Sequence, residues 1–228
     1  MRFIVAAYFV LIANTCFAST ISYEFDATIT PDGVLDPLLP SGIVPGDTLK
    51  ATFLVAGDAV SSGDSTYGYY PSPLLGGTIT IANKNWVVKP AADDFVLVWD
   101  GADAGSGHFF DVFWVQSSAV VGDSLNNLAP WYIGFSLFSD KPKPNNAIVD
   151  TKLPLQLNLS DFNYFAQGSF TFGDLSSFAR FNLAITNIVV KEVASVPEPS
   201  GLVLMLASLV SLFLIKSIKT ARKTYRGL

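Results

Sequence analysis

The feature that most constrains the fold of this chain is a strict alternation of apolar and polar residues close to its N-terminus. Five apolar side chains, from Ile21 to Ile29, alternate with five polar ones, from Ser22 to Thr30. Successive side chains of a strand point to opposite faces of the sheet, so this pattern predicts a strand with one buried and one solvated face. Strands of this kind are typical of antiparallel sheets, because parallel sheets are covered on both faces.

The alternation recurs along residues 19–195, which we expect to form one all-β domain. The 18 phenylalanines of the chain favour sheet structure as well. We predict an antiparallel two-sheet sandwich of the jelly-roll kind, with a closed barrel as the alternative. Further strands are predicted at 49–55, 79–88 (with a hairpin loop at Asn83–Asn85), 95–99, 109–115, 133–137, 153–159, 170–172 and 181–193.

The N-terminus has the pattern of a secretory signal peptide, which we assign to residues 1–18. Arg2 is followed by an uncharged apolar run that is too short to span a bilayer. Cys16 and Ala18 occupy positions −3 and −1 of a small-residue cleavage pattern, so we expect the cut between Ala18 and Ser19. The alternative is that Cys16 is the lipidated cysteine of a bacterial lipoprotein, although the residues before it fit that motif poorly.

A second apolar segment, residues 201–218, is predicted to be a transmembrane helix. As a helix it covers about 27 Å, close to the ~30 Å hydrocarbon core, if Lys216 extends its ammonium group to the headgroups. The tail at 216–228 has no acidic residue, and its charge places it on the cytoplasmic side. A buried core helix with a solvated basic end is the alternative. The basic residues of the tail are Lys216, Lys219, Arg222, Lys223 and Arg226.

The charge of the chain is divided unevenly between the body and the ends. Of the 14 basic residues, six are Arg2 and the five of the tail, which leaves 8 basic against all 19 acidic residues in the body and the linker after it (residues 19–200), a balance of −11. Nucleic-acid binding needs a basic surface, so we expect no nucleic-acid partner. An acidic body is compatible with solubility outside the cell or with divalent cations.

The segment Val196-Pro197-Glu198-Pro199-Ser200 stands directly before the apolar run. Its two prolines cannot continue a helix or a central strand, so it is an extended and accessible linker. The order of Pro-Glu-Pro, transmembrane run and basic cluster resembles the PEP-CTERM sorting signal of exopolysaccharide-producing bacteria. The body is similar to a recurrent ectodomain of that family, with a Gly46-Asp47 turn and a late Gly-Ser-Phe-Thr strand.

The resemblance implies export by the general secretion route and removal of the signal peptide by signal peptidase. An exosortase, a membrane cysteine protease-transpeptidase, would then cut at residues 196–200 of an inner-membrane precursor whose body is periplasmic. The product would reach the cell surface or the extracellular matrix, whereas a permanent single-pass anchor is the alternative. The expected function is that of a surface or matrix protein; a carbohydrate-binding or carbohydrate-active ectodomain associated with exopolysaccharide is the alternative.

The exported body holds a single histidine, His108, and no cysteine once the signal peptide is removed. These residues cannot build a zinc site of three or four His and Cys ligands, nor a thiol nucleophile. The motifs of serine hydrolases, phosphate-binding loops and zinc proteases do not occur in the sequence. We therefore expect no enzymatic activity; a glycosidase with two facing carboxyl groups is the competing hypothesis.

One candidate metal site is the glycine-rich segment 100–107. Asp100 and Asp103 are candidate ligands for Ca²⁺, which takes about six to eight oxygen ligands, so Asp93, Asp94 or backbone oxygens would have to converge with them. The spacing does not match the EF-hand loop. The alternative is that aspartate and glycine here simply form a turn. No other cofactor is expected.

A candidate sugar-binding site is the tyrosine cluster of Tyr67, Tyr69 and Tyr70, which we predict to lie in a loop. Exposed tyrosine rings suit the faces of sugars, whereas the alternative is that they cap one end of the core. The sequon at Asn158 is expected to be unused in a bacterium.

Overall fold

The computed structural model describes residues 19–33, 43–103, 109–140, 147–174 and 178–193, all of which belong to one compact unit, Ser19–Ala194. The predicted signal peptide, sorting motif, transmembrane segment and basic tail lie outside these ranges. Within the ranges, no helix is long and apolar enough to cross a membrane. The described elements are β1 (Thr20–Ile29), η1 (Pro31–Gly33), β2 (Thr48–Ala56), β3 (Tyr67–Pro71), β4 (Leu74–Ile81), β5 (Lys84–Val88), β6 (Phe95–Asp103), β7 (Phe109–Ser117), β8 (Val120–Gly122), β9 (Pro130–Asp140), η2 (Leu159–Asp161), β10 (Phe165–Gly173) and β11 (Phe178–Val193).

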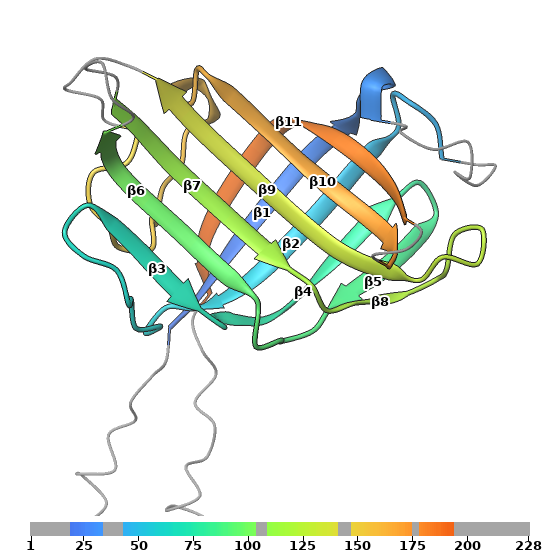
Figure 1. Ribbon diagram of the computed structural model, residues 1–228, viewed down its shortest axis with the longest axis horizontal. Coiled ribbons are helices and arrows are strands. Elements are labelled where there is room, and N and C mark those ends of the chain that lie inside the picture. The colour runs from blue at the N-terminus through green and yellow to red at the C-terminus, as the bar shows by residue number, and fades with distance from the viewer. Residues whose placement is uncertain (1–18, 34–42, 104–108, 141–146, 175–177, 194–228) are drawn as a thin grey trace, which may run out of the picture. The chain divides into compact units, whose positions relative to one another are not determined.

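All the described strands join one sheet of 11 strands, in the order β3-β6-β7-β9-β10-β11-β1-β2-β4-β5-β8. Every pair of neighbours in this order is antiparallel. The sheet is curled, so that the half containing β6, β7, β9 and β10 crosses over the half containing β1, β2 and β4 (Figure 1). The order is open and ends at β3 and β8, so the described strands do not close into a barrel.

The 16-residue strand β11 joins the two halves of the sheet. Its residues 178–184 pair with β10, and its residues 183–193 pair with β1. The register with β1 shifts between Asp26 and Ala27, and a bulge of this kind bends a strand. The prediction of an antiparallel all-β fold is confirmed. The predicted division into two jelly-roll sheets is corrected, because β11 carries the hydrogen bonding from one half to the other.

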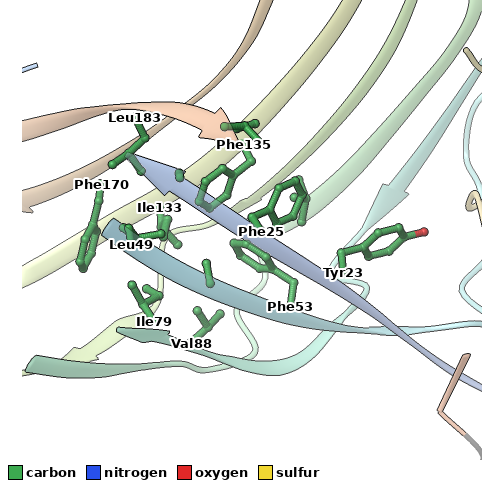
Figure 2. Packing of buried hydrophobic residues seen from close by; sticks show 14 of the residues in the cluster. Tyr23, Phe25, Leu49, Phe53, Ile79, Val88, Ile133, Phe135, Phe170 and Leu183 are labelled. Carbon is green, nitrogen blue, oxygen red and sulfur yellow. The ribbon is translucent and has the colours of Figure 1, made fainter. Parts of the chain in front are cut away.

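The core lies between the two halves and is rich in phenylalanine (Figure 2). Phe25 of β1 stacks on Phe135 of β9 with ring centroids 4.4 Å apart, and Phe53 of β2 meets the same ring edge-on at 5.9 Å. At the other end, Trp86 of β5 packs edge-on against Phe170 of β10 at 5.2 Å. Each fully buried side chain of this size contributes roughly 1.5–3 kcal/mol, so these contacts between strands distant in the sheet order hold the curl together.

The segment before η2 covers part of the core without forming a strand. A strand was predicted at 153–159, but only Leu153 and Leu157 of the alternating leucines are buried, and Leu155 is 55% exposed. Pro154 has no N–H for a sheet hydrogen bond, and its carbonyl oxygen accepts one from Tyr23 Oη at 3.0 Å instead. Burial raises the pKa of the Tyr23 phenol far above its ordinary range, so this hydroxyl keeps its proton and donates.

Candidate functional site

The predicted calcium ligands Asp100 and Asp103 lie in the last residues of β6, where the strand is irregular. The register between β6 and β7 shifts between Trp99 and Ala102, and Gly101 has a φ of 65°. The Gly101 N–H donates to Oδ1 of Asp111 at 2.9 Å. The irregularity of β6 therefore accounts for the glycine at this position, because few other residues adopt that φ without strain.

Asp111 is the buried carboxylate of this region. It is 1% exposed, and its Oδ2 accepts the N–H of Ile148 at 3.0 Å. Burial raises the pKa of Asp111, although its hydrogen bonds from Ile148 and Gly101 oppose the rise. With one oxygen bound to each of two backbone segments, this carboxylate fastens the 147–148 segment to the end of β6.

Asp93 and Asp94 do not converge with Asp100. Asp94 directly precedes β6 and Asp100 lies six residues further along the strand, which separates the two by about 20 Å. Asp94 is 1% exposed, and its carboxylate accepts the N–H groups of Ala91 at 2.8 Å and Ser118 at 3.3 Å. Burial raises its pKa. Within the described residues, no group of three or more His, Cys, Asp or Glu side chains is placed to hold a metal ion.

The tyrosine cluster forms the edge strand β3 and not a loop. Tyr70 is a core residue, 5% exposed, and its Oη donates to the carbonyl oxygen of Thr151 at 2.8 Å. Tyr67 and Tyr69 are half-buried on the other face of the strand, and Tyr69 packs against Phe95 with ring centroids 5.6 Å apart. The cluster is thus divided between the two faces of the sheet.

The other predicted residues are not brought into a common site. Ser19 is the first described residue, whereas Ala18, His108 and residues 194–228 lie outside the described ranges. Asn158 is exposed directly before η2, and its Nδ2 donates to Asp161 Oδ2 at 3.2 Å.

A hollow lies elsewhere, on the outer face of β9, β10 and β11. We call it the outer groove, and its volume is about 520 Å³. Its residues alternate with core residues such as Phe170 and Phe181, as the period of a strand requires. Three rows cross the strands in register: Arg180–Thr171–Tyr132, Asn182–Ser169–Gly134 and Ala184–Gln167–Ser136. The lining is Thr30, Asp32, Tyr132, Gly134, Ser136, Phe165, Ala166, Gln167, Gly168, Ser169, Arg180, Asn182, Leu183 and Ala184.

The outer groove is hollow because the middle of its floor carries small side chains. Gly134 has none, and Ser136, Ser169 and Ala184 are short. A Cβ at Gly134 would lie 2.5 Å from the hydroxyl oxygen of Tyr132, so the tyrosine side chain passes over this glycine. Tyr132 Oη donates to Gln116 Oε1 on β7 at 3.0 Å, which holds the ring in that position.

A second hollow of about 300 Å³ adjoins the outer groove and shares Tyr132 and Arg180 with it. We call it the aromatic pocket. Thr171 pairs with Tyr132 but Phe172 pairs with Pro130, so Trp131 is the extra residue of a bulge. Bulges re-aim side chains, and here Trp131 and Tyr132 both reach the same hollow. The lining is Trp131, Tyr132, Thr171, Phe178 and Arg180.

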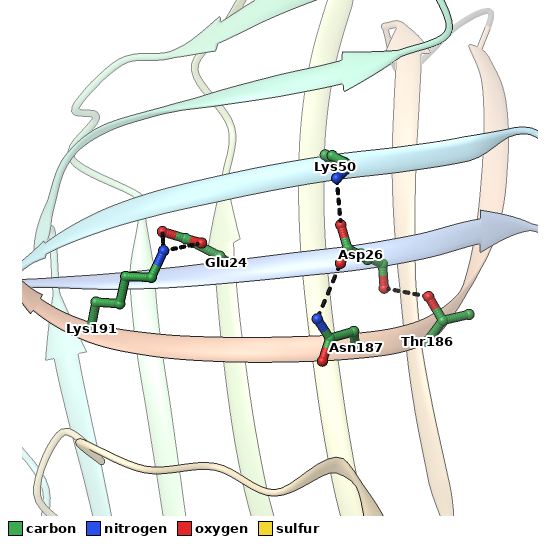
Figure 3. A network of polar contacts seen from close by, with 6 residues as sticks. All are labelled: Glu24, Asp26, Lys50, Thr186, Asn187 and Lys191. Atoms are coloured by element: carbon green, nitrogen blue, oxygen red, sulfur yellow. Dashed lines mark hydrogen bonds and ion pairs between the residues drawn. The ribbon is translucent and has the colours of Figure 1, made fainter.

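Arg180 lines both hollows. Its Nε is buried and has no hydrogen-bond partner within the described part of the chain. Two other cations have acidic partners: Lys191 Nζ, further along β11, lies 2.8 Å from both carboxylate oxygens of Glu24, and Lys50 Nζ on β2 lies 3.6 Å from Asp26 Oδ1 (Figure 3). Arg180 differs from these two lysines, because no ion pair joins it to an acid of the described residues.

The pKa of the Tyr132 phenol depends in part on the charge of Arg180. Burial raises the pKa of its phenol, and a hydrogen bond with Trp114 and the positive charge of Arg180 oppose part of the rise. The phenol thus remains a neutral hydrogen-bonding group beside a cation. Together the two hollows offer an aromatic wall, one guanidinium group and several amide and hydroxyl groups.

Sequence reasoning did not find this site. One signal was present, because Arg180 is the single arginine between Arg2 and Arg222. Comparison with protein-family models, with curated proteins and with solved structures finds no match for this chain.

Proposed function

We propose that the chain is an exported surface or extracellular-matrix protein that an exosortase processes at its PEP-CTERM segment. The support is the order of three features in the sequence: the Pro197-Glu198-Pro199 linker, the apolar run 201–218 and the basic tail. Each feature serves one step, since the linker exposes backbone to a protease, the run stops transfer and the tail sets the orientation.

The sorting step is tested by mass spectrometry of both termini of the protein produced in an exosortase-bearing bacterium. The double variant Pro197→Ala, Glu198→Ala is expected to remain membrane-bound and uncut, whereas Ser195→Ala, a control just before the motif, is expected to be processed normally. Normal cutting and release of the double variant would refute the sorting proposal. If the unaltered protein and the double variant both stay uncut in the membrane, the single-pass anchor is favoured instead.

We propose further that the exported domain is a saccharide-binding module, and the observation that carries this is the pair of adjoining hollows around Arg180. Small-molecule sites combine apolar or aromatic walls with a few placed polar groups. Trp131 and Phe178 supply the wall, and Asn182 and Gln167 supply amide groups that both donate and accept, as sugar hydroxyls require. The two hollows together have room for more than one sugar unit.

The lining favours binding over hydrolysis. Glycosidases use two carboxyl groups that flank the scissile bond, about 5–9.5 Å apart. Among the described residues that line the outer groove and the aromatic pocket, Asp32 is the one with a carboxyl group. A carbohydrate-active enzyme is for this reason only the second candidate. Release of reducing ends from any polymer that binds would favour the enzyme.

Binding is tested with a panel of neutral and acidic bacterial exopolysaccharides immobilised on an array. Trp131→Ala is expected to reduce binding at least tenfold, because it removes the aromatic wall. Tyr69→Ala is the matched control and is expected to bind as the unaltered protein does. Tyr69 is a half-buried aromatic residue of the outer face, on the edge strand β3. Loss of binding in Tyr69→Ala but not in Trp131→Ala would place the site on β3. If the unaltered protein binds no polymer, the proposal of a saccharide-binding module is refuted.

A further inference from the structure

We infer that the outer groove selects saccharides that carry a carboxylate, and that Arg180 is the residue that recognises it. This inference rests on the proposed saccharide-binding function and adds the chemical class of the ligand. Its basis is the position of Arg180, the one cationic side chain that lines both hollows, which has no ion pair with an acid of the described residues.

The guanidinium group has no acid of its own among the described residues. A guanidinium group that lines a hollow and has no carboxylate of its own is free to pair with one that arrives with the ligand. Glu24 and Asp26 on β1 are occupied by Lys191, Lys50 and Asn187 (Figure 3). These acids are thus unavailable to Arg180, although they lie on the same face of the sheet.

The geometry of arginine suits a carboxylate better than a hydroxyl. Its planar fork presents parallel N–H groups that match the two oxygens of a carboxylate, and such charge-assisted pairs are about twice as strong as neutral ones. Arg180 lies in register with Thr171 and Tyr132, and all three residues line the aromatic pocket. The next row, with Asn182 and Ser169, offers partners for the hydroxyl groups of the same sugar.

The charge of the whole body limits what kind of acidic saccharide is suitable. With 8 basic against 19 acidic residues, the body carries −11 and repels densely charged polymers at long range. One arginine between two hollows fits a polymer with isolated carboxylates along an otherwise uncharged chain. Densely sulfated or phosphorylated polymers are expected to bind poorly.

The test compares an oligosaccharide that carries a single uronate with its methyl ester, in which the carboxylate charge is removed, by calorimetry on the purified protein. The free acid is expected to bind about 10- to 100-fold more tightly, the range of a charge-assisted hydrogen bond. Arg180→Gln is expected to bind both ligands equally. Lys89→Gln, which removes the same charge from an exposed position beyond β5, is the control and should keep the preference.

The outcomes separate this inference from the function on which it rests. Equal binding of the acid and the ester by the unaltered protein would overturn the carboxylate inference and leave the saccharide-binding module standing. A preference for the acid that survives in Arg180→Gln would overturn the assignment to Arg180. Failure to bind either ligand or any polymer of the array would refute the proposed function itself. The comparison of acid with ester needs no variant, so it holds even if Arg180→Gln unfolds.

Discussion

Replacing Gly168 with alanine tests how tightly the curled sheet is packed at its centre. Gly168 of β10 lies opposite Phe135 of β9. A Cβ at this position would lie 2.6 Å from Cδ1 and 2.8 Å from Cε1 of the Phe135 ring, and 2.9 Å from the carbonyl oxygen of Gly134. The ring has little room to retreat, because it stacks on Phe25 with centroids 4.4 Å apart.

The expected cost follows from two opposing effects. Extra atoms forced into a well-packed core cost about 1–3 kcal/mol. Alanine restricts the unfolded chain more than glycine does, which returns about 0.4–1 kcal/mol. We therefore expect Gly168→Ala to lower the free energy of unfolding by about 1–2 kcal/mol, measured by urea denaturation followed through tryptophan fluorescence.

A second substitution identifies the cause of this loss. Phe135→Leu destabilises the protein by itself but removes the ring that the new Cβ meets, so Gly168→Ala should cost less in that background, by at least ~0.5 kcal/mol. Gly134→Ala is the control in the neighbouring strand, because its Cβ meets the far end of the Tyr132 side chain on the outer face and not a ring stacked in the core. An equal cost of Gly168→Ala with Phe or Leu at position 135, or a gain in stability, would refute the reasoning.

Two further predictions concern polar groups that fasten loops to the sheet. Tyr23→Phe removes the donor to the Pro154 carbonyl and is expected to cost about 1–3 kcal/mol in urea denaturation, because that acceptor is left without its partner; an unchanged midpoint would show that water replaces the hydroxyl. Burial raises the pKa of Asp111, so the folded state binds its proton more tightly than the unfolded state does, and this group lowers stability as the pH rises from the ordinary range of an aspartate through its raised pKa. Asp111→Asn should remove that part of the slope of unfolding free energy against pH. It should also lower stability at every pH, since the side-chain amide has one acceptor oxygen where the carboxylate uses two, for Gly101 and Ile148. Identical slopes in the two proteins would contradict the assignment to Asp111.

The strands that face the core were predictable, because each places apolar residues at every second position. Ile21 to Ile29 is the clearest case, and β1 occupies nearly those residues. The leucines at 153–159 have the same period and yet form no strand, since Pro154 interrupts the hydrogen bonding and tyrosine hydroxyls bind the carbonyl groups instead. Side-chain period reports which face is buried, but not whether another strand is available as a partner.

The number of sheets could not be predicted from these patterns. A sandwich of two sheets and one sheet curled on itself require the same alternation, since in both the inner faces of two layers meet. The two folds differ in whether one strand forms hydrogen bonds with strands of both layers. Here β11 is long enough to do so, and the extra residue at Thr186 bends it between its two partners.

The candidate site escaped prediction for a related reason. Its residues lie on the polar face of strands, where alternation predicts only contact with solvent. What makes a site of them is register across three strands, which sets Arg180 beside Thr171 and Tyr132. The bulge that adds Trp131 is likewise a property of pairing and not of composition.

The acidic loops and the outer groove illustrate opposite uses of a polar group in this fold. Asp94 was a candidate ligand in the sequence, but it is buried and accepts backbone N–H groups, as Asp111 also does, so the oxygens of both are already used to hold loops in place. Arg180 looked like one more surface cation, yet its buried Nε has no partner within the described ranges. A polar group satisfied by its own backbone contributes to stability, whereas a cation that lines a hollow without an acid of its own can pair with a ligand.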